Sequence, residues 1–453
     1  MDTAWYQNAI FYHIYPLGLS GASTRNDFTA PIEQGLHRLY PWLAHAQSLG
    51  CNALYLGPVF QSSSHGYDTS DYYQVDRRLG DNDALARFSA AVHQHGMRLV
   101  LDAVFNHVGR DFWAFKDVLE QGENSPYTDW FQNLRFGETS PMGDSFRYEG
   151  WQGHYSLVKL NLAHPHVRAH LFDAVGLWMD RFNIDGLRLD AADCIDLDFL
   201  RALRSFVKNR QADFWLMGEV VHGDYRDWAN PETLDSVTNY ECYKGLFSSL
   251  NASNYFEVAY SLDRQFGRQG LYREISLYNF VDNHDVDRVA SKLAKGEHLY
   301  PLYLLLFSMP GIPAMYYGSE WGIQGVKGQY SDAPLRPVLD LNQMARQSPH
   351  PDLVEVIRKL ADIRQCSTAL RHGDYQPLHV DHQQLAFVRQ SPEEVIVAVL
   401  NSEPRQVNLY LRPPGNMHAF EDLLDPGMIV PVVDGQINID LAASWGRLLK
   451  GVR

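Results

Sequence analysis

The sequence predicts an α/β fold: a (β/α)8 TIM barrel with a short subdomain inserted after strand 3 and a C-terminal antiparallel β-sandwich. Three observations lead to this prediction. Short apolar runs alternate with longer helical patterns through most of the 453 residues, which is typical of a parallel sheet. The connection after the third of these runs is unusually long. After about residue 370 the pattern changes to the period-two alternation of antiparallel strands.

Eight short runs rich in apolar and β-forming residues are the predicted barrel strands. They lie at residues 10–15, 53–56, 98–103, 186–189, 214–218, 236–238, 277–281 and 313–316. Eight strand–helix units of this kind close naturally into a barrel.

Helical patterns separate these strands. Gly50 suits a C-terminal helix cap, and the apolar residues on one helical face before it are Leu39, Trp42, Leu43, Ala46 and Leu49. A longer helix is predicted over residues 165–182, where Pro165 stands at the start. The apolar residues at helical spacing within this helix are Val167, Leu171, Val175 and Trp178.

The strand and helix pattern divides the chain into three parts. Residues 1–107 and 159–370 are expected to form the barrel. Residues 108–158 are rich in Gly, aromatic and polar residues and lack a clean helix, and they are expected to form a loop-rich subdomain over the barrel mouth. A connection of that length in a compact domain is usually functional. Residues 371–453 are expected to form the C-terminal β-sandwich.

Composition excludes several classes of function. Acidic residues outnumber basic ones, 54 to 39, and the formal charge of −15 argues against nucleic acid as a partner. No run of about 18 apolar residues exists, so we expect no membrane span. The apolar stretch 9–19 has no basic flank and contains His13, which predicts a buried strand rather than a signal peptide. The four scattered cysteines indicate free thiols and a cytoplasmic location; the oligomeric state is not readable.

Polar and charged residues gather where five of the predicted strands end. In a barrel of this type the carboxyl ends of the strands carry the site. The segments at these ends are HGYD at 65–68, DAVFNH at 102–107, RLD at 188–190, GE at 218–219 and DNHD at 282–285. Burying so much uncompensated charge at one mouth is expensive, so these residues predict a functional site rather than separate salt bridges.

Three of these acids suit glycoside cleavage, which needs two carboxyl groups in opposite protonation states on either side of one bond. Arg188 lies two residues before Asp190 on the same strand face. We expect this cation to lower the pKa of Asp190 and keep it ionised as a nucleophile. Glu219 must instead hold a proton near neutral pH and act as general acid/base. Asp285 is predicted to favour the positive charge that develops at the anomeric carbon.

An oligosaccharide is therefore the expected substrate. His107 and His284 are predicted to donate hydrogen bonds to hydroxyls of the reacting sugar, although a lone histidine is more often structural. The 25 Tyr, 22 Phe and 10 Trp residues supply flat faces of the kind that hold sugar rings. The prediction requires Asp190 and Glu219 to lie about 5 to 5.5 Å apart at one end of the barrel.

At these residues the sequence resembles the α-amylase family of glycoside hydrolases, over nearly the whole chain. The family's four signature segments are similar, in order, to DAVFNH at 102–107, GLRLDAAD at 186–193, GEV at 218–220 and FVDNHD at 280–285. Two further family segments resemble HGYDTSDYYQVD at 65–76 and GIPAMYYGSE at 311–320. The resemblance implies a retaining mechanism through a covalent glycosyl-enzyme intermediate.

The resemblance also implies a role for each matching residue. It implies Asp190 as nucleophile, Glu219 as acid/base and Asp285 as the stabiliser of the transition state. The residues that it places around the reacting glucose, the first stacked on the ring, are Tyr67, His107, Arg188 and His284. Asp332 and Arg336 fall where family members contact more distant glucose units.

The segment VKLN at 158–161 resembles that of neopullulanases, cyclomaltodextrinases and oligo-1,6-glucosidases. This implies cleavage of α-glucosidic bonds, α-1,4 favoured, in short or cyclic maltooligosaccharides. Amylases often carry a Lys-His pair three and four residues after the nucleophile, which helps to bind the leaving-group side and calcium. This chain has Asp193 and Cys194 there. Asn106 matches a residue that often ligates calcium, so calcium is a possible ligand, although no cofactor is required.

Three alternatives stay open at this point. An α-glucan transglycosylase or isomerase would use the same catalytic residues, with a sugar in place of water. A metal-dependent hydrolase would take its ligands from the histidines and acids of the strand ends, but the charge of Arg188 opposes a metal ion; these ligands would be His107, Glu219, His284 and Asp285. A non-catalytic binding protein would be expected to have lost one or more of the three acids, and all three are present.

Overall fold

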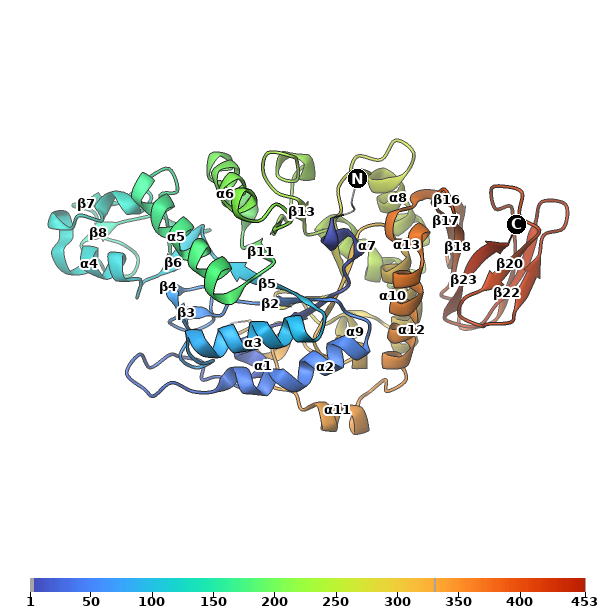
Figure 1. The fold of residues 1–453 in the computed structure, drawn as a ribbon, viewed down its shortest axis with the longest axis horizontal. Coiled ribbons are helices and arrows are strands. Elements are labelled where there is room, and N and C mark those ends of the chain that lie inside the picture. The colour runs from blue at the N-terminus through green and yellow to red at the C-terminus, as the bar shows by residue number, and fades with distance from the viewer. Residues whose placement is uncertain (1–3, 330, 453) are drawn as a thin grey trace.

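Eight parallel strands form a barrel in the computed structural model, which describes residues 4–329 and 331–452 (Figure 1). The strands are β1 (Phe11–Ile14), β2 (Ala53–Leu56), β5 (Arg98–Ala103), β11 (Gly186–Leu189), β12 (Trp215–Gly218), β13 (Ser236–Val237), β14 (Tyr278–Phe280) and β15 (Ile312–Tyr316). Their order around the sheet is β13, β12, β11, β5, β2, β1, β15, β14, and a parallel bridge between Thr238 and Tyr278 closes the ring. The predicted barrel is confirmed, with each strand end within one residue of its predicted position.

Helices surround the barrel and connect its strands (Figure 1). Those of the barrel region are α1 (Pro16–Leu19), α2 (Tyr40–Ser48), α3 (Asn82–Gln94), α5 (Pro165–Phe182), α6 (Leu197–Arg210), α7 (Tyr240–Asn251), α8 (Tyr255–Phe266), α9 (Val289–Lys292), α10 (Leu299–Ser308), α11 (Leu341–Gln347), α12 (Leu353–Cys366) and α13 (Thr368–His372). Two of them match the sequence pattern closely. Gly50 follows α2 with a φ of 81°, a conformation that favours glycine, and α5 begins at Pro165 as predicted.

The interior of the barrel is filled by alternate residues of each strand. Near the amino ends of the strands Phe11 stacks on Trp215, with ring centroids 5.0 Å apart, and meets Tyr278 edge-on. Towards the carboxyl ends the inward positions become charged, as at Asp102 and Arg188, which are both buried. An apolar layer therefore fills the amino end of the barrel, and a polar cluster lies next to it towards the carboxyl end.

The segment that follows β5 contains more regular structure than we predicted. Helix α4 (Trp113–Gln121) buries Ala114, Phe115 and Val118, so the prediction that this segment lacks a clean helix is wrong. Its buried positions span little more than one turn, which is too short a window for helical spacing to show in the sequence. The other elements here are β6 (His107–Gly109), β7 (Arg135–Phe136), β8 (Phe146–Arg147), β9 (Gly150–Trp151) and β10 (His154–Lys159). This inserted segment lies at the opposite end of the molecule from the C-terminal sheets (Figure 1).

A short antiparallel pair of strands follows β2. Strand β3 (Phe60–Ser62) pairs with β4 (Thr69–Val75), and the turn between them carries the HGYD segment. The turn therefore stands at the carboxyl end of β2, on the same side of the barrel as the other polar segments.

Two antiparallel sheets form the C-terminal part of the chain, as predicted. The larger follows the order β16, β17, β18, β23, β20, β21, and β19 pairs with β22. The strands are β16 (Asp374–Val380), β17 (Gln384–Gln390), β18 (Val395–Asn401), β19 (Val407–Leu411), β20 (Ala419–Asp422), β21 (Ile429–Pro431), β22 (Ile437–Leu441) and β23 (Trp445–Val452). Phe387 and Ile396 face the core shared with the barrel, whereas Val388 and Val397 face the core between the two sheets.

Two buried arginines supply donors near the end of α10, and the second of them joins the C-terminal sheets to the barrel. Arg364 donates to the carbonyl oxygen of Phe307 at 2.7 Å, near the end of α10. Arg389, on β17, donates to the carbonyl oxygens of Ser308 at 2.8 Å and Gly373 at 2.9 Å. The last carbonyl groups of a helix have no partner within the helix, so these guanidinium groups supply one.

We expect Arg389→Met to destabilise the protein by about 3 kcal/mol, because the buried carbonyl oxygen of Ser308 and the partly buried one of Gly373 lose their donor. The midpoint of thermal unfolding, followed by circular dichroism, measures the effect. Arg405→Met is the matched control, since the side chain of Arg405 is 76% exposed and its loss is expected to change stability by less than about 0.5 kcal/mol. An unchanged midpoint for Arg389→Met would show that these carbonyl groups find other partners.

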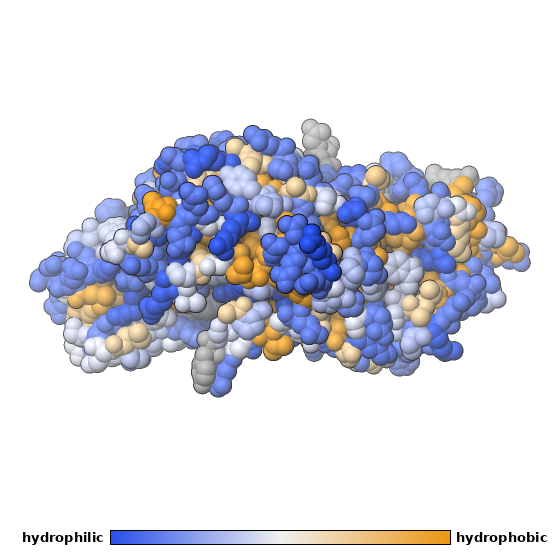
Figure 2. Space-filling view, turned by 90° about the horizontal axis from the view of Figure 1, so that it is seen from below, coloured by the Kyte–Doolittle hydropathy of each residue, from blue (hydrophilic) through white to orange (hydrophobic). Residues whose placement is uncertain are grey.

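The surface is mostly hydrophilic. On the face shown in Figure 2, hydrophobic residues occur in small groups separated by hydrophilic ones. Among the described residues, no helix has both the length and the apolar character needed to span a membrane.

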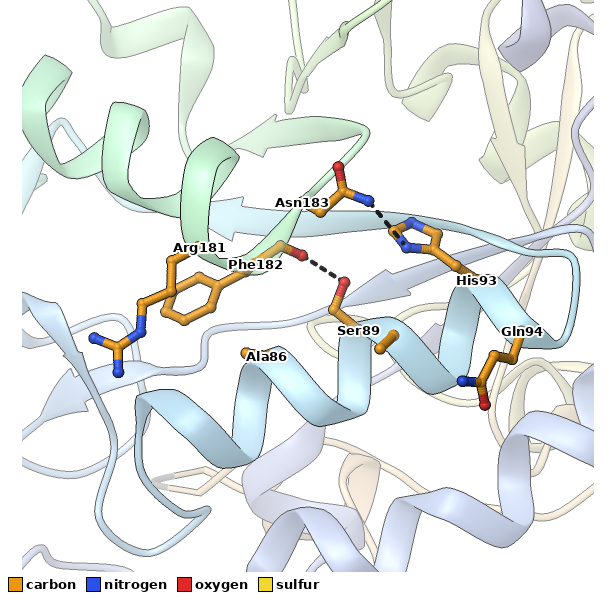
Figure 3. Close-up of a pocket in the computed structure, with 8 residues that line it drawn as sticks. Ala86, Ser89, His93, Gln94, Arg181, Phe182 and Asn183 are labelled. Atoms are coloured by element: carbon orange, nitrogen blue, oxygen red, sulfur yellow. Dashed lines mark hydrogen bonds between the residues drawn. The ribbon is translucent and has the colours of Figure 1, made fainter.

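A surface cavity of about 530 Å³ lies between α3 and α5 (Figure 3). Several of its polar groups are paired with one another: Ser89 donates to the carbonyl oxygen of Phe182, and the amide of Asn183 contacts His93. Both helices end here, just before β5 and β11 begin. The cavity therefore lies at the amino ends of the strands, away from the polar cluster, and we assign no function to it.

Candidate active site

The strand register brings the predicted acids together at the carboxyl end of the barrel. Strand β11 pairs with β5 so that Arg188 lies beside Asp102. Asp190 and Glu219 follow β11 and β12 directly, and the amide of Glu219 continues the pairing by donating to the carbonyl oxygen of Leu189 at 2.9 Å. Because neighbouring strands are about 4.8 Å apart, the carboxyl groups of Asp190 and Glu219 emerge side by side.

Arg188 is the cation that the carboxylates share. One terminal nitrogen lies 2.9 Å from Asp102 and 2.8 Å from Asp190, and the other lies 2.7 Å from Glu219. Both nitrogens belong to one planar guanidinium. Asp190 and Glu219 are therefore held close enough together to act on the same bond of a substrate. One buried cation among three carboxyl groups leaves an excess of negative charge, which favours retention of one proton by the cluster.

The chain turns sharply directly after Asp190. Ala191 has a φ of 45°, in the left-handed region that residues other than glycine and asparagine seldom adopt. Its amide donates to Glu219 Oε2 at 3.2 Å, and the next amide, of Ala192, donates to the carbonyl oxygen of Glu219 at 2.9 Å. The turn thus fixes the position of Glu219 relative to Asp190. Strained backbone of this kind gathers at functional sites.

The direction of the pKa shift of Asp190 differs from our prediction. Burial raises the pKa of Asp190 well above the ordinary aspartate value, and the negative charges of Glu219 and Asp102 add to the rise. Arg188 opposes the rise, as expected from its contact, but does not reverse it. The prediction of a lowered pKa was therefore wrong, because the cost of burying a charge among other acids exceeds the attraction of one cation.

Asp285 stands on the opposite wall of the site, after β14. Its carboxylate lies 2.9 Å from Arg336 and 2.9 Å from the ring of His284. Burial alone would raise the pKa of Asp285, but His284 and Arg336 hold it well below the usual aspartate range, so this carboxyl group is ionised. The hydroxyl of Tyr67 donates to Asp102 at 2.9 Å and also contacts His284, which links the two walls.

His107 and Asp332 lie at the edge of the cluster. The Nε2 atom of His107 is 3.9 Å from Asp190 and has no hydrogen-bond partner among the described residues. Burial, and then the charge of His65, lower the pKa of His107 to about 3, so its ring is neutral. A neutral ring with an unpaired nitrogen suits a sugar hydroxyl. Asp332 reaches the cluster through Arg336, at 3.2 Å.

Two tyrosines belong to this cluster although the sequence did not single them out. The hydroxyl of Tyr240 donates to Glu219 at 3.3 Å. Tyr15 stacks on His284, and the guanidinium of Arg336 lies 4.4 Å from the centre of its ring. Tyr15 is the last residue of the first predicted strand, and Tyr240 lies two residues after the sixth. This position was the available signal, but an aromatic residue there is equally suited to the core.

Asn106 is the residue that we predicted as a calcium ligand. Calcium prefers six to eight oxygen ligands, carboxylates among them. The Asn106 side-chain nitrogen is 3.1 Å from the ring of His107, and the carbonyl oxygen of Asn106 accepts the amide of Leu160. The described part of the chain holds no cluster of three or more His, Cys, Asp or Glu side chains placed for a metal ion. Asn106 as a calcium ligand stays a prediction, and we assign no chemical step to a metal.

Comparison with known families gives one match over most of the chain. The model of the α-amylase catalytic domain matches residues 39–369. That range contains the barrel strands from β2 to β15 and every acid of the cluster described above.

Known proteins with similar sequences and structures extend this match. A cyclomaltodextrinase from a Bacillus species is 32% identical over 425 residues, covering 88% of this chain and 74% of that protein. Neopullulanase 2 of Thermoactinomyces vulgaris is 31% identical over 474 residues, covering 98% and 78%. The solved structure of a cyclic α-maltosyl-(1→6)-maltose hydrolase from Arthrobacter globiformis matches with a TM-score of 0.83 at 27% identity, over 99% of this chain and 100% of that one.

Proposed function

The chain belongs to the α-amylase family of glycoside hydrolases, and from this premise we propose that it cleaves α-glucosidic bonds in short or cyclic maltooligosaccharides with retention of anomeric configuration. The bond that it cleaves is α-1,4 by preference. The observation that carries the proposal is the contact of Asp190 and Glu219 with adjacent nitrogens of Arg188. This arrangement suits the short carboxyl separation, about 5 to 5.5 Å, that a double displacement needs.

In the first step Asp190 attacks the anomeric carbon while Glu219 gives a proton to the leaving oxygen. The bond between the sugar carbon and that oxygen breaks, and an ester between Asp190 and the sugar forms. Arg188 stays in contact with both carboxyl groups, so it can stabilise the charge that remains as the proton leaves. In the second step Glu219 takes a proton from water, whose oxygen displaces Asp190 and restores the starting cluster.

The opposite wall would hold the sugar ring during both steps. Asp285 is ionised and faces the cluster, so it is placed to stabilise positive charge at the anomeric carbon. The buried Nε2 of His107 lies near Asp190, and that of His284 lies 2.9 Å from Asp285; we assign both rings to hydroxyls of the reacting glucose. Tyr67, fixed by its hydrogen bond to Asp102, is the stacking partner of that ring.

The names of the similar proteins support short or cyclic maltooligosaccharides as the substrates. The similar proteins described above are named for cyclic maltooligosaccharides or pullulan. Arg336 and Asp332 occupy the side of the site beyond Asp285, where they are placed to bind the next glucose unit. All four cysteines lie within the described residues and none is in a disulfide, which supports a reducing, cytoplasmic location.

Product analysis by NMR tests the proposal. With maltotriose we expect the newly formed reducing end to appear first as the α-anomer, followed by slow mutarotation. A panel of maltose, cyclodextrins, pullulan and isomaltose would rank the substrates. A β-anomer as first product would rule out double displacement, and longer or rearranged products in place of glucose and maltose would assign the protein as a transglycosylase or isomerase.

We expect Asp102→Asn to move the acid limb of the pH profile of kcat/KM to lower pH. Asp102 is one of the anions that raise the pKa of Asp190, and its neutralisation also leaves Arg188 freer to stabilise the ionised nucleophile. Activity is lost as pH falls through the pKa of Asp190, because the protonated acid is not a nucleophile. A lower pKa therefore extends activity into more acidic solution. The control is Asp111→Asn, whose side chain is 41% exposed, and an acid limb that stays in place would contradict this account.

A further inference from the structure

We propose that Tyr240, held by Asn283, is a positioning residue for the acid/base Glu219. Its hydroxyl fixes the carboxyl oxygen from which the proton leaves and stabilises the negative charge that then forms on that oxygen. This role rests on the function proposed above, in which Glu219 gives a proton to the leaving oxygen of the sugar.

The two carboxyl oxygens of Glu219 have different surroundings. Oε2 accepts from a terminal nitrogen of Arg188 at 2.7 Å and from the amide of Ala191 at 3.2 Å. These two donors occupy the lone pairs of Oε2, so this oxygen does not carry a hydrogen of its own. Oε1 has one hydrogen-bond partner among the described residues, the hydroxyl of Tyr240 at 3.3 Å. The proton that Glu219 transfers is therefore carried by Oε1.

Asn283 sets the direction of the Tyr240 hydroxyl. The side-chain oxygen of Asn283 accepts the amides of Asp285 at 2.9 Å and Val286 at 3.2 Å. Its side-chain nitrogen faces the oxygen of Tyr240 at 3.0 Å, and an amide nitrogen can only donate. Burial, and then the charge of Glu219, raise the pKa of Tyr240 well above its ordinary value, so the hydroxyl keeps its hydrogen. That hydrogen is then free to be donated to Oε1 of Glu219.

The fold holds the ring of Tyr240 in one place. Tyr240 is the first residue of α7, and the side chain of Asn239 caps this helix. Asn239 is itself fixed by donating to the buried side chain of Gln265 at 2.9 Å. The ring of Tyr240 packs edge-on against Phe280 of β14, with centroids 4.9 Å apart. The hydroxyl is therefore delivered to Glu219 by two elements of the barrel that do not carry the acids themselves.

The hydrogen bond from Tyr240 acts differently in the two steps of the reaction. In the first step Oε1 of Glu219 loses its hydrogen and becomes negatively charged, and a hydrogen bond to a charged acceptor is stronger than one to a neutral acceptor. Tyr240 therefore lowers the barrier to proton transfer. In the second step Glu219 takes a proton from water and its charge disappears, so the same hydrogen bond gives no help. Loss of the hydroxyl should slow only the first step, and only for leaving groups that need a proton.

Two aryl glycosides with similar leaving groups test this role. Dinitrophenolate departs from dinitrophenyl α-maltoside without a proton, whereas the leaving group of phenyl α-maltoside needs one. We expect Tyr240→Phe to lower kcat/KM for phenyl α-maltoside about tenfold, as for a lost hydrogen bond to a charged group. Both kcat/KM and kcat for dinitrophenyl α-maltoside should stay within about twofold of the wild-type values, since the second step keeps its rate. Initial rates of phenol release measure both substrates.

Tyr243→Phe is the matched control. Tyr243 lies on the same helix and stacks on the same Phe280, with centroids 5.1 Å apart, but its buried hydroxyl has no hydrogen-bond partner among the described residues. This variant should leave both substrates within about twofold of wild type, and circular dichroism checks the folding of both variants. Equal losses with the two substrates in Tyr240→Phe, or no loss with phenyl α-maltoside, would overturn the role of Tyr240 alone. A wild-type protein that cleaves neither maltoside would overturn the proposed function, and the role of Tyr240 with it.

Discussion

Replacing Asp190 with Asn is expected to lower kcat for maltotriose by at least about 10⁴-fold, because an amide cannot form the ester that carries the sugar between the two steps. Asn keeps the size of the side chain and can still accept a hydrogen bond from Arg188, so we expect the fold to be retained. Initial rates, with circular dichroism of both proteins as a check on folding, measure this.

The matched control is Asp198→Asn, in which the replaced side chain is 73% exposed on α6. Its kcat should stay within about twofold of the wild-type value, since surface substitutions change little. A loss of only a few-fold in Asp190→Asn would mean that this carboxylate is not the nucleophile. The protein would then have to be considered as a binding protein on the same fold.

Glu219→Gln is expected to affect two substrates differently, because the leaving group of only one of them needs a proton. With maltotriose the loss should be about 10² to 10⁴-fold, the contribution of general acid catalysis. With α-glucosyl fluoride, whose leaving group departs without a proton, the first turnover should release fluoride in a burst and the second step should then be slow. Stopped-flow detection of fluoride measures both phases.

Azide provides the control for this variant within the same experiment. It needs no base to attack the glycosyl-enzyme, so it should restore turnover of Glu219→Gln and give α-glucosyl azide as the product. Equal losses with maltotriose and α-glucosyl fluoride, with no effect of azide, would contradict the acid/base role of Glu219.

Much of the fold could be predicted because buried parallel strands and amphipathic helices leave clear periodic patterns in the sequence. Strands β2, β5 and β11 have the predicted bounds, and α5 begins and ends as predicted. Helix α4 could not be predicted, since its short apolar stretch lies among aromatic residues whose role depends on the packing of the whole inserted segment. Its burial against Phe131, Phe146 and Tyr148 is a tertiary effect.

The residues of the site could be predicted from the sequence, but the direction of the pKa shift of Asp190 could not. Strand ends of a barrel converge, so Asp190, Glu219 and Asp285 could be expected at one mouth from their positions alone. The upward shift in the pKa of Asp190 depends on how completely the cluster is buried and on how many carboxylates surround Arg188. Neither property is local in the sequence. Tyr240 was missed for the same reason, because its contact with Glu219 comes from a helix that starts 21 residues later.

Trapping of the covalent intermediate tests the central claim most directly. A 5-fluoro-glucosyl fluoride of α configuration forms the glycosyl-enzyme quickly and releases it slowly, so mass spectrometry of the digested protein can locate the sugar. The account predicts one fluoroglucosyl group per chain, attached to the carboxylate of Asp190. A label on Glu219 or Asp285, or cleavage of the reagent with no label on the protein, would contradict it.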